Sequence, residues 1–240
     1  MLSGKMVLIT GATGALGRVT ARRVAGEGAR TALTGRNRGA LEELAASIAT
    51  ELSLPGDRIF VQTADLGSQE DVQGLVDSVV GHWGGIDALV NIAGGWRGGK
   101  PVAEVSEKEW DETLDTNLRS AFLACRAVVP IMAKKGWGRI VSISSRAAEN
   151  PGAGQAAYNV AKAGLIALTA SIAAEYRRSG LAANAILPSI IDTPQNRTAM
   201  PDADTSRWVT PEEIASLIVY LLSEEGGSLN GAAIPVYGRV

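Results

Sequence analysis

The sequence predicts a doubly wound α/β fold, in which seven parallel strands form one sheet with helices on both faces. Short continuous apolar runs such as Met6–Thr10 are typical of strands that are buried on both faces. These runs alternate strictly with longer helical stretches, which indicates repeated strand–helix–strand units. The 240 residues fit a single domain, residues 1–240.

The first half of the chain contains four expected strands and three expected helices. The strands are apolar runs, and the helices are rich in Ala, Leu and Glu. In chain order, we expect a strand at Met6–Thr10, a helix after it to about Gly28, a strand at Arg30–Thr34, a helix at Arg38–Leu52, a strand at Arg58–Thr63, a helix at Gln69–Trp83 and a strand at Ile86–Ile92.

The second half continues the alternation around one irregular segment. We expect a long helix at about Glu107–Lys134, a strand at Arg139–Ile143, a helix at Gln155–Ser179, a strand at Ala182–Leu187, a helix at Pro211–Ser223 and a last strand at Ala232–Val236. Thr210 suits the N-cap of the helix that begins at Pro211, because proline is favoured in the first helical turn. The residues between Leu187 and Thr210 show no helix or strand pattern.

The composition excludes several classes of function. The 25 acidic residues nearly balance the 23 basic ones, so we expect neither nucleic acid nor an anionic membrane as a partner. Cys125 is the only cysteine and His82 the only histidine, so we expect no disulfide and no metal site. Because a strand begins by about Lys5, there is no room for a signal peptide, and we expect a soluble cytoplasmic protein.

The stretch from Ser144 to Lys162 carries the clearest catalytic pattern. Tyr158 and Lys162 are four residues apart, so on a helix they lie one turn apart on the same face. A nearby cation favours the phenolate, so Lys162 is expected to lower the pKa of Tyr158 towards neutrality, where general acid–base catalysis works best. Ser145, at the end of a strand, could polarise the same substrate oxygen.

A glycine motif follows the first strand. Gly11, Gly14 and Gly17 lie where that strand turns into the first helix. Glycines at such a turn let the backbone approach a pyrophosphate, whose charge is favoured at the helix N-terminus. The motif therefore predicts a dinucleotide site.

Together these motifs resemble the short-chain dehydrogenase/reductase family, whose Rossmann-like fold agrees with the architecture above. The matching segments occur in order from end to end: Thr10-Gly-Ala-Thr-Gly-Ala-Leu-Gly17, Asp65-Leu66, Asn91-Ile-Ala-Gly94, Asn117, Ser145, Tyr158-x-x-x-Lys162 and Pro188-Ser-Ile-Ile-Asp-Thr193. The resemblance implies an NAD(P)-dependent oxidoreductase that transfers a hydride between a nicotinamide and a carbonyl or alcohol, such as a carbonyl or 3-oxoacyl-type ketone reductase.

The resemblance also implies a role for each catalytic residue. Tyr158 would donate and accept the proton, and Ser145 would orient the substrate carbonyl. Lys162 would hold the nicotinamide ribose and lower the pKa of Tyr158. Asn117 would hold a relay water through its backbone carbonyl.

The residues that would contact the cofactor come from several segments. Asp65 and the Leu66 amide would bind the adenine, although Asp65 could also simply cap the following helix. Ile191 and Thr193 would receive the carboxamide of the nicotinamide. The full set is Gly11, Thr13, Gly14, Ala15, Leu16, Gly17, Arg36, Arg38, Asp65, Leu66, Asn91, Ala93, Gly94, Tyr158, Lys162, Pro188, Ile191 and Thr193.

The chain departs from the family pattern at a few positions. Ala15 stands where a glycine is usual, and the spacing of Gly11, Gly14 and Gly17 is similar to that of sugar-nucleotide epimerases. Those proteins need a further C-terminal lobe that 240 residues cannot hold, so we reject that branch. Ser189 replaces a usual glycine, and Tyr237 a usual aspartate.

The residues after the second strand indicate the cofactor. NAD sites usually carry an acidic residue about 20 positions after the glycine motif. Here Arg36 and Arg38 follow the strand, with no acidic residue before Glu42. Because arginine matches the geometry of a phosphate, we expect NADP(H) to be preferred over NAD(H). The alternative is that both are ordinary loop arginines.

Two loops, about 94–105 and 189–209, would border the substrate pocket. Gly94–Gly99 and Asp192–Asp204 are similar to dihydropteridine reductase, which leaves quinonoid pteridines as alternative substrates. The loops could equally share only a shape, with Trp96 and Trp208 packing. Their basic residues either meet an anionic group or are solvated: Arg97, Lys100 and Arg197.

Two further expectations concern activity and assembly. A sensor that binds the dinucleotide without turnover remains an alternative, although no catalytic residue is missing. By resemblance, the helix at Glu107–Lys134 and the helix after Tyr158 would pair across a two-fold axis, giving a homodimer or homotetramer.

Overall fold

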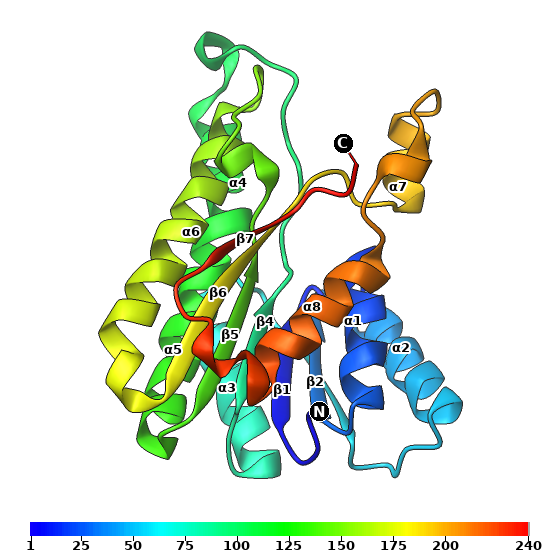
Figure 1. The fold of residues 1–240 in the computed structure, drawn as a ribbon, viewed down its shortest axis with the longest axis vertical. Coiled ribbons are helices and arrows are strands. Elements are labelled where there is room, and N and C mark those ends of the chain that lie inside the picture. The colour runs from blue at the N-terminus through cyan, green and yellow to red at the C-terminus, as the bar shows by residue number, and fades with distance from the viewer. Residues whose placement is uncertain (240) are drawn as a thin grey trace.

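The computed structural model describes residues 1–239 and contains one seven-stranded sheet. All its strand pairs are parallel, in the order β3-β2-β1-β4-β5-β6-β7 (Figure 1). The predicted fold class, a doubly wound parallel sheet flanked by helices, is therefore confirmed. The strands are β1 (Met6–Thr10), β2 (Arg30–Gly35), β3 (Ile59–Thr63), β4 (Ala88–Asn91), β5 (Gly138–Ile143), β6 (Leu181–Pro188) and β7 (Ala233–Val236).

Two helical layers cover the two faces of the sheet (Figure 1). Successive side chains of a strand point to opposite faces, so Val7 and Ile9 of β1 pack into one layer and Leu8 into the other. The first layer consists of α1 (Ala15–Gly26), α2 (Arg38–Glu51) and α8 (Pro211–Leu222); the second contains α3 (Gln69–Trp83), α5 (Ser120–Lys135) and α6 (Ala156–Tyr176).

One predicted helix is interrupted. Instead of a continuous helix at Glu107–Lys134, the chain forms α4 (Glu107–Leu114), a π-helical turn at Asp115–Arg119 and then α5. Asn117 is buried in that turn. Single π turns inside helices are frequent at functional sites. The backbone alone therefore makes Asn117 a candidate site residue.

A short helix in the segment expected to be irregular was missed. Helix α7 spans Pro194–Ala199, and the hydroxyl of Thr193 caps it by accepting a hydrogen bond from the amide of Asn196 at 3.1 Å. A threonine followed by proline is a typical helix start, so the sequence did carry this signal.

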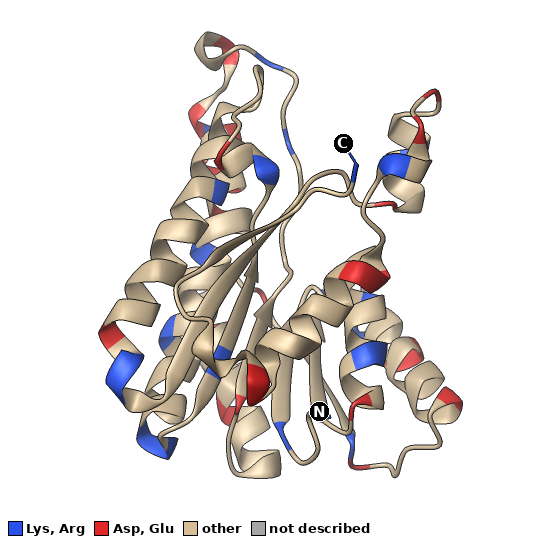
Figure 2. Cartoon of the chain, viewed as in Figure 1, with Lys and Arg blue, Asp and Glu red and all other residues tan. Residues whose placement is uncertain are grey.

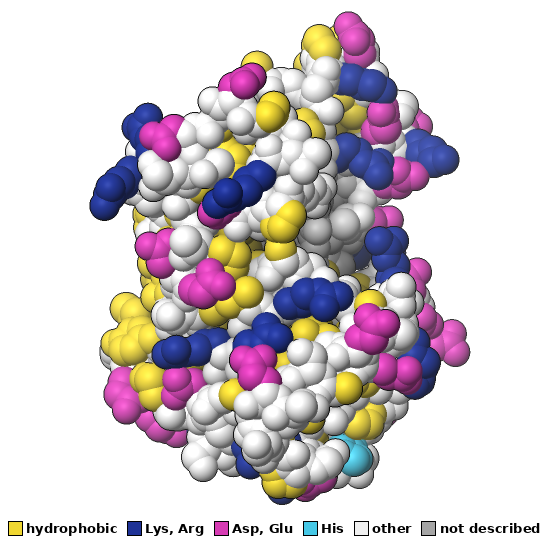
Figure 3. Space-filling view, turned by 90° about the vertical axis from the view of Figure 1, so that its right-hand side faces the viewer, with side chains coloured by type: hydrophobic (Ala, Val, Ile, Leu, Met, Phe, Trp, Pro, Cys, Tyr) yellow, Lys and Arg dark blue, Asp and Glu magenta, His cyan; other side chains and the backbone are white. Residues whose placement is uncertain are grey.

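The surface has mixed charge, and one side of it is hollowed. Acidic and basic residues are interspersed over the helices (Figure 2). Seen from the side that carries α7, the surface is hollowed across its middle, between α7 above and α1 and α2 below (Figure 3). The hollow lies beside the carboxyl ends of the strands, where ligands bind in open α/β sheets.

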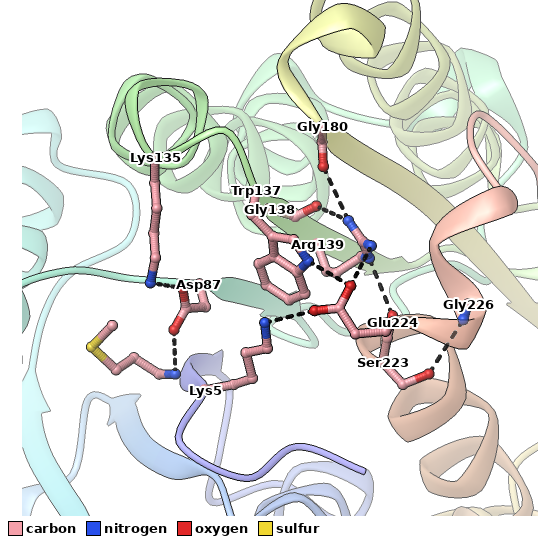
Figure 4. Close-up of polar contacts among 11 residues, drawn as sticks. Lys5, Asp87, Lys135, Trp137, Gly138, Arg139, Gly180, Ser223, Glu224 and Gly226 are labelled. Carbon is pink, nitrogen blue, oxygen red and sulfur yellow. Dashed lines mark hydrogen bonds and ion pairs between the residues drawn. The ribbon is translucent and has the colours of Figure 1, made fainter.

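At the opposite end of the sheet, where the strands begin, Arg139 joins several elements. Its side chain is only 7 % exposed and donates hydrogen bonds to the carbonyls of Gly138, Gly180 and Ser223 at 2.9, 3.1 and 3.3 Å (Figure 4). Its guanidinium lies 4.5 Å from the ring centroid of Trp137. Arg139 thus joins β5 to the start of β6 and to the end of α8.

We expect Arg139→Met to lower the free energy of unfolding by about 2–4 kcal/mol, because three carbonyls lose a charged donor. Chemical denaturation of the variant measures this change. Arg126→Met is the matched control, since Arg126 is exposed and hydrogen-bonds only to Gln69 among residues 1–239. Equal losses in the two variants would contradict the assignment.

Candidate active site

The carboxyl end of β5 and helix α6 are joined by reciprocal hydrogen bonds. The ammonium of Lys162 donates to the carbonyl of Ile143 at 2.9 Å, and the hydroxyl of Ser144 donates to the carbonyl of Lys162 at 2.7 Å. The Lys162 ammonium lies 5.6 Å from the ring centroid of Tyr158. The structure therefore brings the predicted tyrosine and lysine together, and it adds Ser144 as a positioning residue.

Ser145 lies two residues after the end of β5 and caps a short 3₁₀ turn, Arg146–Ala148. Its backbone is extended, and its hydroxyl oxygen accepts a hydrogen bond from the amide of Ala147 at 3.1 Å. The same hydroxyl also interacts with the Tyr158 phenol. Ser145 and Tyr158 thus face one another, as the sequence predicted.

The predicted direction of the Tyr158 pKa shift is wrong. Burial raises the pKa of the phenol, and the nearby Ser145 hydroxyl opposes this by a smaller amount. Burial outweighs any lowering of this pKa by Lys162, whose ammonium lies 5.6 Å from the ring centroid and donates to the carbonyl of Ile143. Burial also lowers the pKa of Lys162 to about 8. At neutral pH the phenol therefore holds its proton, and Lys162 is largely charged.

The Asn117 side chain is fully engaged by its neighbours. Its amide nitrogen donates to the carbonyls of Gly95 and Thr113, both at 3.0 Å, and its oxygen accepts from the amide of Gly95 at 3.0 Å. The side chain therefore fixes the segment after β4 against the π turn. The predicted relay water, held by its backbone carbonyl, stays a prediction.

The glycine loop between β1 and α1 is closely packed. Gly11 has a φ of +65°, and a Cβ there would lie 2.8 Å from the amide nitrogen of Ala93. A Cβ at Gly17 would lie 2.2 Å from the carbonyl oxygen of Gly11, so neither position tolerates a side chain. Gly14 is the N-cap of α1, and Ala15 begins the helix on its exposed side. The remaining motif residues, Thr13 and Leu16, belong to the same turn and first helical turn.

Thr10 was not among the predicted site residues, but it organises this edge. Its hydroxyl oxygen accepts hydrogen bonds from the amides of Ile92 and Ala93 at 3.1 and 3.2 Å. It thereby joins the end of β1 to the segment after β4. Its place just before Gly11, at the end of the first strand, was the feature of the sequence that could have pointed to this role.

The segment Asn91–Gly94 is divided between core and cleft. The Asn91 side chain is buried and donates to the sulfur of Cys125 and the hydroxyl of Ser142, both at 3.3 Å. It faces the core, so only its backbone remains for a cofactor. A Cβ at Gly94 would lie 3.3 Å from the Lys162 ammonium, which places Gly94 beside the catalytic lysine.

Asp65 does not cap the following helix. Ser68 is the N-cap of α3, and its hydroxyl oxygen accepts from the amide of Asp71 at 3.2 Å. The Asp65 carboxylate instead accepts from the amide of Gly67 at 2.9 Å, in the turn that also contains Leu66. The carboxylate is exposed and keeps its second oxygen for the predicted adenine contact.

The segment from Pro188 to Thr193 leaves the end of β6 beside the hollow. Ile191 forms a parallel bridge with Val209, and its carbonyl accepts from the side chain of Asn196 at 2.8 Å. Ser189 replaces the usual glycine without a positive φ, and its hydroxyl donates to the carbonyl of Tyr237 at 2.7 Å. The backbone here accommodates serine.

The two arginines after β2 differ in their surroundings. Arg38 begins α2 and pairs with Glu42 at 3.0 Å, whereas Arg36 forms no ion pair within residues 1–239. Arg18 of α1 was not predicted; its side chain donates to the carbonyl of Thr13 at 2.9 Å. Gly35 and Thr13 lie close together, which brings both loops to one place. Lys and Arg side chains border the hollow from below (Figure 3).

These residues fit a nicotinamide dinucleotide. Lys162 is a buried cation with no carboxylate within 4 Å in residues 1–239, so its remaining N–H donors suit ribose hydroxyls. The glycine loop presents backbone without side chains to a pyrophosphate. Within the same residues, no cluster of three or more His, Cys, Asp or Glu could hold a metal ion.

Comparisons with known proteins agree with this geometry. Residues 5–204 match the family model of short chain dehydrogenases. A subunit of (2S)-[(R)-hydroxy(phenyl)methyl]succinyl-CoA dehydrogenase from Thauera aromatica is 34 % identical over 246 residues, covering 99 % of this chain and 96 % of that protein. The comparisons do not show the narrower resemblance to dihydropteridine reductase.

Solved structures are similar over nearly the whole chain. Levodione reductase superposes with a TM-score of 0.91 at 30 % identity, covering 99 % of this chain and 98 % of that one. NAD⁺-bound xylitol dehydrogenase gives a TM-score of 0.90 at 30 % identity, covering 99 % of both chains. The chain belongs to the short-chain dehydrogenase/reductase family.

Proposed function

We propose that this protein is an NADP(H)-preferring oxidoreductase that reduces a ketone to a secondary alcohol, or oxidises the alcohol in reverse. The observation that carries the proposal is the meeting of Ser145, Tyr158 and the buried Lys162 at the carboxyl end of β5. The nicotinamide, when bound, supplies or accepts the hydride.

The three side chains divide the remaining chemistry. Ser145 donates a hydrogen bond to the carbonyl oxygen and holds it beside Tyr158. Tyr158 gives its proton to that oxygen as the carbon is reduced, which suits a phenol whose pKa is raised by burial. Lys162 holds the ribose hydroxyls, and its charge stabilises the phenolate that forms. Asn117 supports proton return through its backbone carbonyl.

The relatives support this class of reaction. Their names describe a reductase of levodione and dehydrogenases of xylitol and of an aryl succinyl-CoA compound. A panel of ketones, quinones and quinonoid pteridines, followed by loss of the reduced-cofactor absorbance, tests the proposal. Turnover of ketones supports it. Turnover of pteridines alone would replace the substrate class, and cofactor binding without any turnover would indicate a sensor.

The cofactor preference rests on Arg36. It lies just after β2, is exposed and has no carboxylate partner within residues 1–239, so its guanidinium is available to a 2′-phosphate. Arg18 approaches the same region through its contact with Thr13. The bound NAD⁺ of the xylitol dehydrogenase structure belongs to that protein; here the missing acidic residue and these two arginines favour NADP(H).

The pKa of Lys162 predicts how cofactor affinity depends on pH. A folded-state pKa of about 8, below the usual value for lysine, means that the ammonium is charged below pH 8 and loses its proton above it. A charged donor binds ribose oxygens more strongly than a neutral one, so we expect the affinity for NADPH to fall about fivefold or more between pH 7 and pH 9.

Cofactor fluorescence titrations at the two pH values measure this change. Lys162→Ala should bind NADPH more weakly at pH 7 and show little further loss at pH 9, with a lower turnover as well. Wild-type affinity that stays constant across this range, or a variant that keeps the full pH dependence, would contradict the role given to Lys162.

We also propose that the outer face of α4, α5 and α6 pairs with a second copy. Residues 156–179, which contain α6, are apolar enough to cross a membrane by length and composition alone, yet α6 packs on β6. Only 39 % of the most apolar window is buried within one chain. Phe122 and Val160 are 44 % and 47 % exposed. A second copy would cover this surface.

We therefore expect light scattering to give the mass of a dimer or tetramer. Phe122→Asp should shift the mass towards the monomer, because a charge would be desolvated at the interface. Ala46→Asp is the control, since Ala46 is exposed on α2, which covers the other face of the sheet. A concentration-independent wild-type monomer would end this proposal.

A further inference from the structure

Trp96 is the large aromatic side chain that the structure leaves uncovered beside the site. It is 65 % exposed, whereas Trp208, on the other substrate loop, is only 7 % exposed. The alternative that both tryptophans pack is thus right for Trp208 and wrong for Trp96. Burial of apolar surface is favourable, and this indole is hardly buried by its own chain. A ligand that covered it would therefore gain free energy of binding.

The segment that carries Trp96 runs alongside the start of α6. Gly94 lies beside the Lys162 ammonium. The side chain of Asn117 accepts a hydrogen bond from the amide of Gly95 and donates one to its carbonyl. Further on, a Cβ at Gly98 would lie 3.0 Å from the Cβ of Gln155, the N-cap residue of α6. The segment therefore passes from the level of Lys162 to the residue one turn before Tyr158.

The indole of Trp96 is held in one orientation. Its N–H donates to the side-chain oxygen of Gln155 at 2.7 Å. The ring atom Cζ2 lies 2.8 Å from where a Cβ of Gly98 would stand, so a side chain at that position would push the ring aside. A fixed ring presents a flat face at little entropic cost, as aromatic anchors of binding sites do.

The loop below the ring is seated on α4. Arg97 pairs with Glu112, and Lys100 pairs with Glu109. The amides of Gly99 and Lys100 donate to the carbonyl of Gly154. The cavity left between the loop and the two helices has a volume of only about 30 Å³, enough for about one water. The loop is therefore closely packed against α4 and the start of α6.

The same ion pairs restrict the charge of the substrate. Arg97 and Lys100 are neutralised by α4, and Arg197 forms a two-pronged pair with Asp192 at 2.6 and 2.7 Å. An anionic substrate would have to displace a carboxylate already in place. Arg97, Lys100 and Arg197 thus have carboxylate partners, whereas Arg207 of the second loop forms no ion pair within residues 1–239 and donates to the carbonyl of Arg239.

We propose that Trp96 binds the substrate and that the substrate is an uncharged ketone with a flat aromatic or conjugated ring. The ring lies against the Trp96 indole, which places the carbonyl at Ser145 and Tyr158. The inference rests on the proposed function and adds the substrate class to it.

Steady-state kinetics with NADPH, 2-acetylnaphthalene and 2-butanone tests this. Trp96→Ala should raise the KM for the aryl ketone about tenfold and leave kcat within about twofold, because a stacked aromatic pair is lost. The KM for 2-butanone, which has no ring to stack, should rise by a several-fold smaller factor, and Trp96→Phe should keep most of the aryl preference. Equal losses on both ketones would overturn the inference and leave the proposed function intact.

A binding measurement separates the inference from the proposed function. The probe is 1-(2-naphthyl)ethanol with NADPH, a ternary complex that cannot react. We expect saturable quenching of tryptophan fluorescence and about tenfold weaker binding in Trp96→Ala. If no ketone is reduced but this difference persists, the proposed function fails and the binding of a flat ring by Trp96 stands without it. Probe binding equal in wild type and Trp96→Ala would overturn the inference.

A charged substrate analogue tests whether the substrate is uncharged. 6-Acetyl-2-naphthoate has the same rings as the neutral ketone and adds one carboxylate. We expect its kcat/KM to be at least about tenfold lower than that of 2-acetylnaphthalene, because Arg97, Lys100 and Arg197 are already paired with carboxylates. Equal or higher efficiency with the acid would contradict the uncharged substrate class.

Discussion

Replacing Tyr158 by phenylalanine is expected to lower kcat for ketone reduction by about 10²–10⁴-fold, the usual contribution of a positioned proton donor. The phenol is the group beside Ser145 that can protonate the carbonyl oxygen, and its raised pKa keeps that proton at neutral pH. Affinity for NADPH should stay near that of the wild type, because the phenylalanine ring fills the same space. Stopped-flow kinetics and a cofactor titration measure the two quantities.

Tyr176→Phe is the matched control, since it removes a phenol at the far end of the same helix. It should leave kcat within about twofold, as expected for a change away from the site. Ordinary turnover in Tyr158→Phe would contradict the catalytic assignment. Loss of both turnover and cofactor binding would mean that the residue is structural.

Replacing Arg36 by aspartate should reverse the cofactor preference. We expect the wild-type protein to favour NADPH over NADH by at least about tenfold in kcat/KM, from one charge-assisted hydrogen bond to the 2′-phosphate. The aspartate removes this attraction and adds a repulsion, while a carboxylate suits the 2′-hydroxyl of NADH. The ratio of the two kcat/KM values, measured with one ketone, reports the change.

Arg38→Asp is the control because Arg38 already pairs with Glu42. Its effect on the cofactor ratio should be several-fold smaller than that of Arg36→Asp. Equal efficiency with NADPH and NADH in the wild type would refute the preference. A larger effect at Arg38 would move the phosphate contact to the start of α2.

The parts of the structure that repeat along the chain were the most predictable. Apolar strands such as β1 follow from periodicity, and strict alternation with helices gives a parallel sheet. The spacing of Tyr158 and Lys162 sets their place on one helix face. Gly11 and Gly17 could be predicted from the motif after the first strand, and close backbone contacts at this turn do exclude side chains there.

The parts that depend on distant contacts were not predictable. The π turn at Asn117 accompanies hydrogen bonds to Gly95, 22 residues away. The pKa of Tyr158 depends on how deeply the phenol is buried, which a Tyr–Lys spacing does not report. The exposure of Trp96 depends on the loop and on Gln155, 59 residues further along the chain. Such long-range effects outweigh local patterns at functional sites.

Hydride transfer to a carbonyl carbon at the Ser145–Tyr158–Lys162 site can be followed with an isotope. The protein is incubated with 2-acetylnaphthalene and NADPH that is deuterated at C4 of the nicotinamide. We expect deuterium at the carbinol carbon of the alcohol, detected by mass spectrometry, in the wild type but not in Tyr158→Phe over the same time. Alcohol without deuterium when both C4 positions are labelled, or equal labelling by the two proteins, would contradict it.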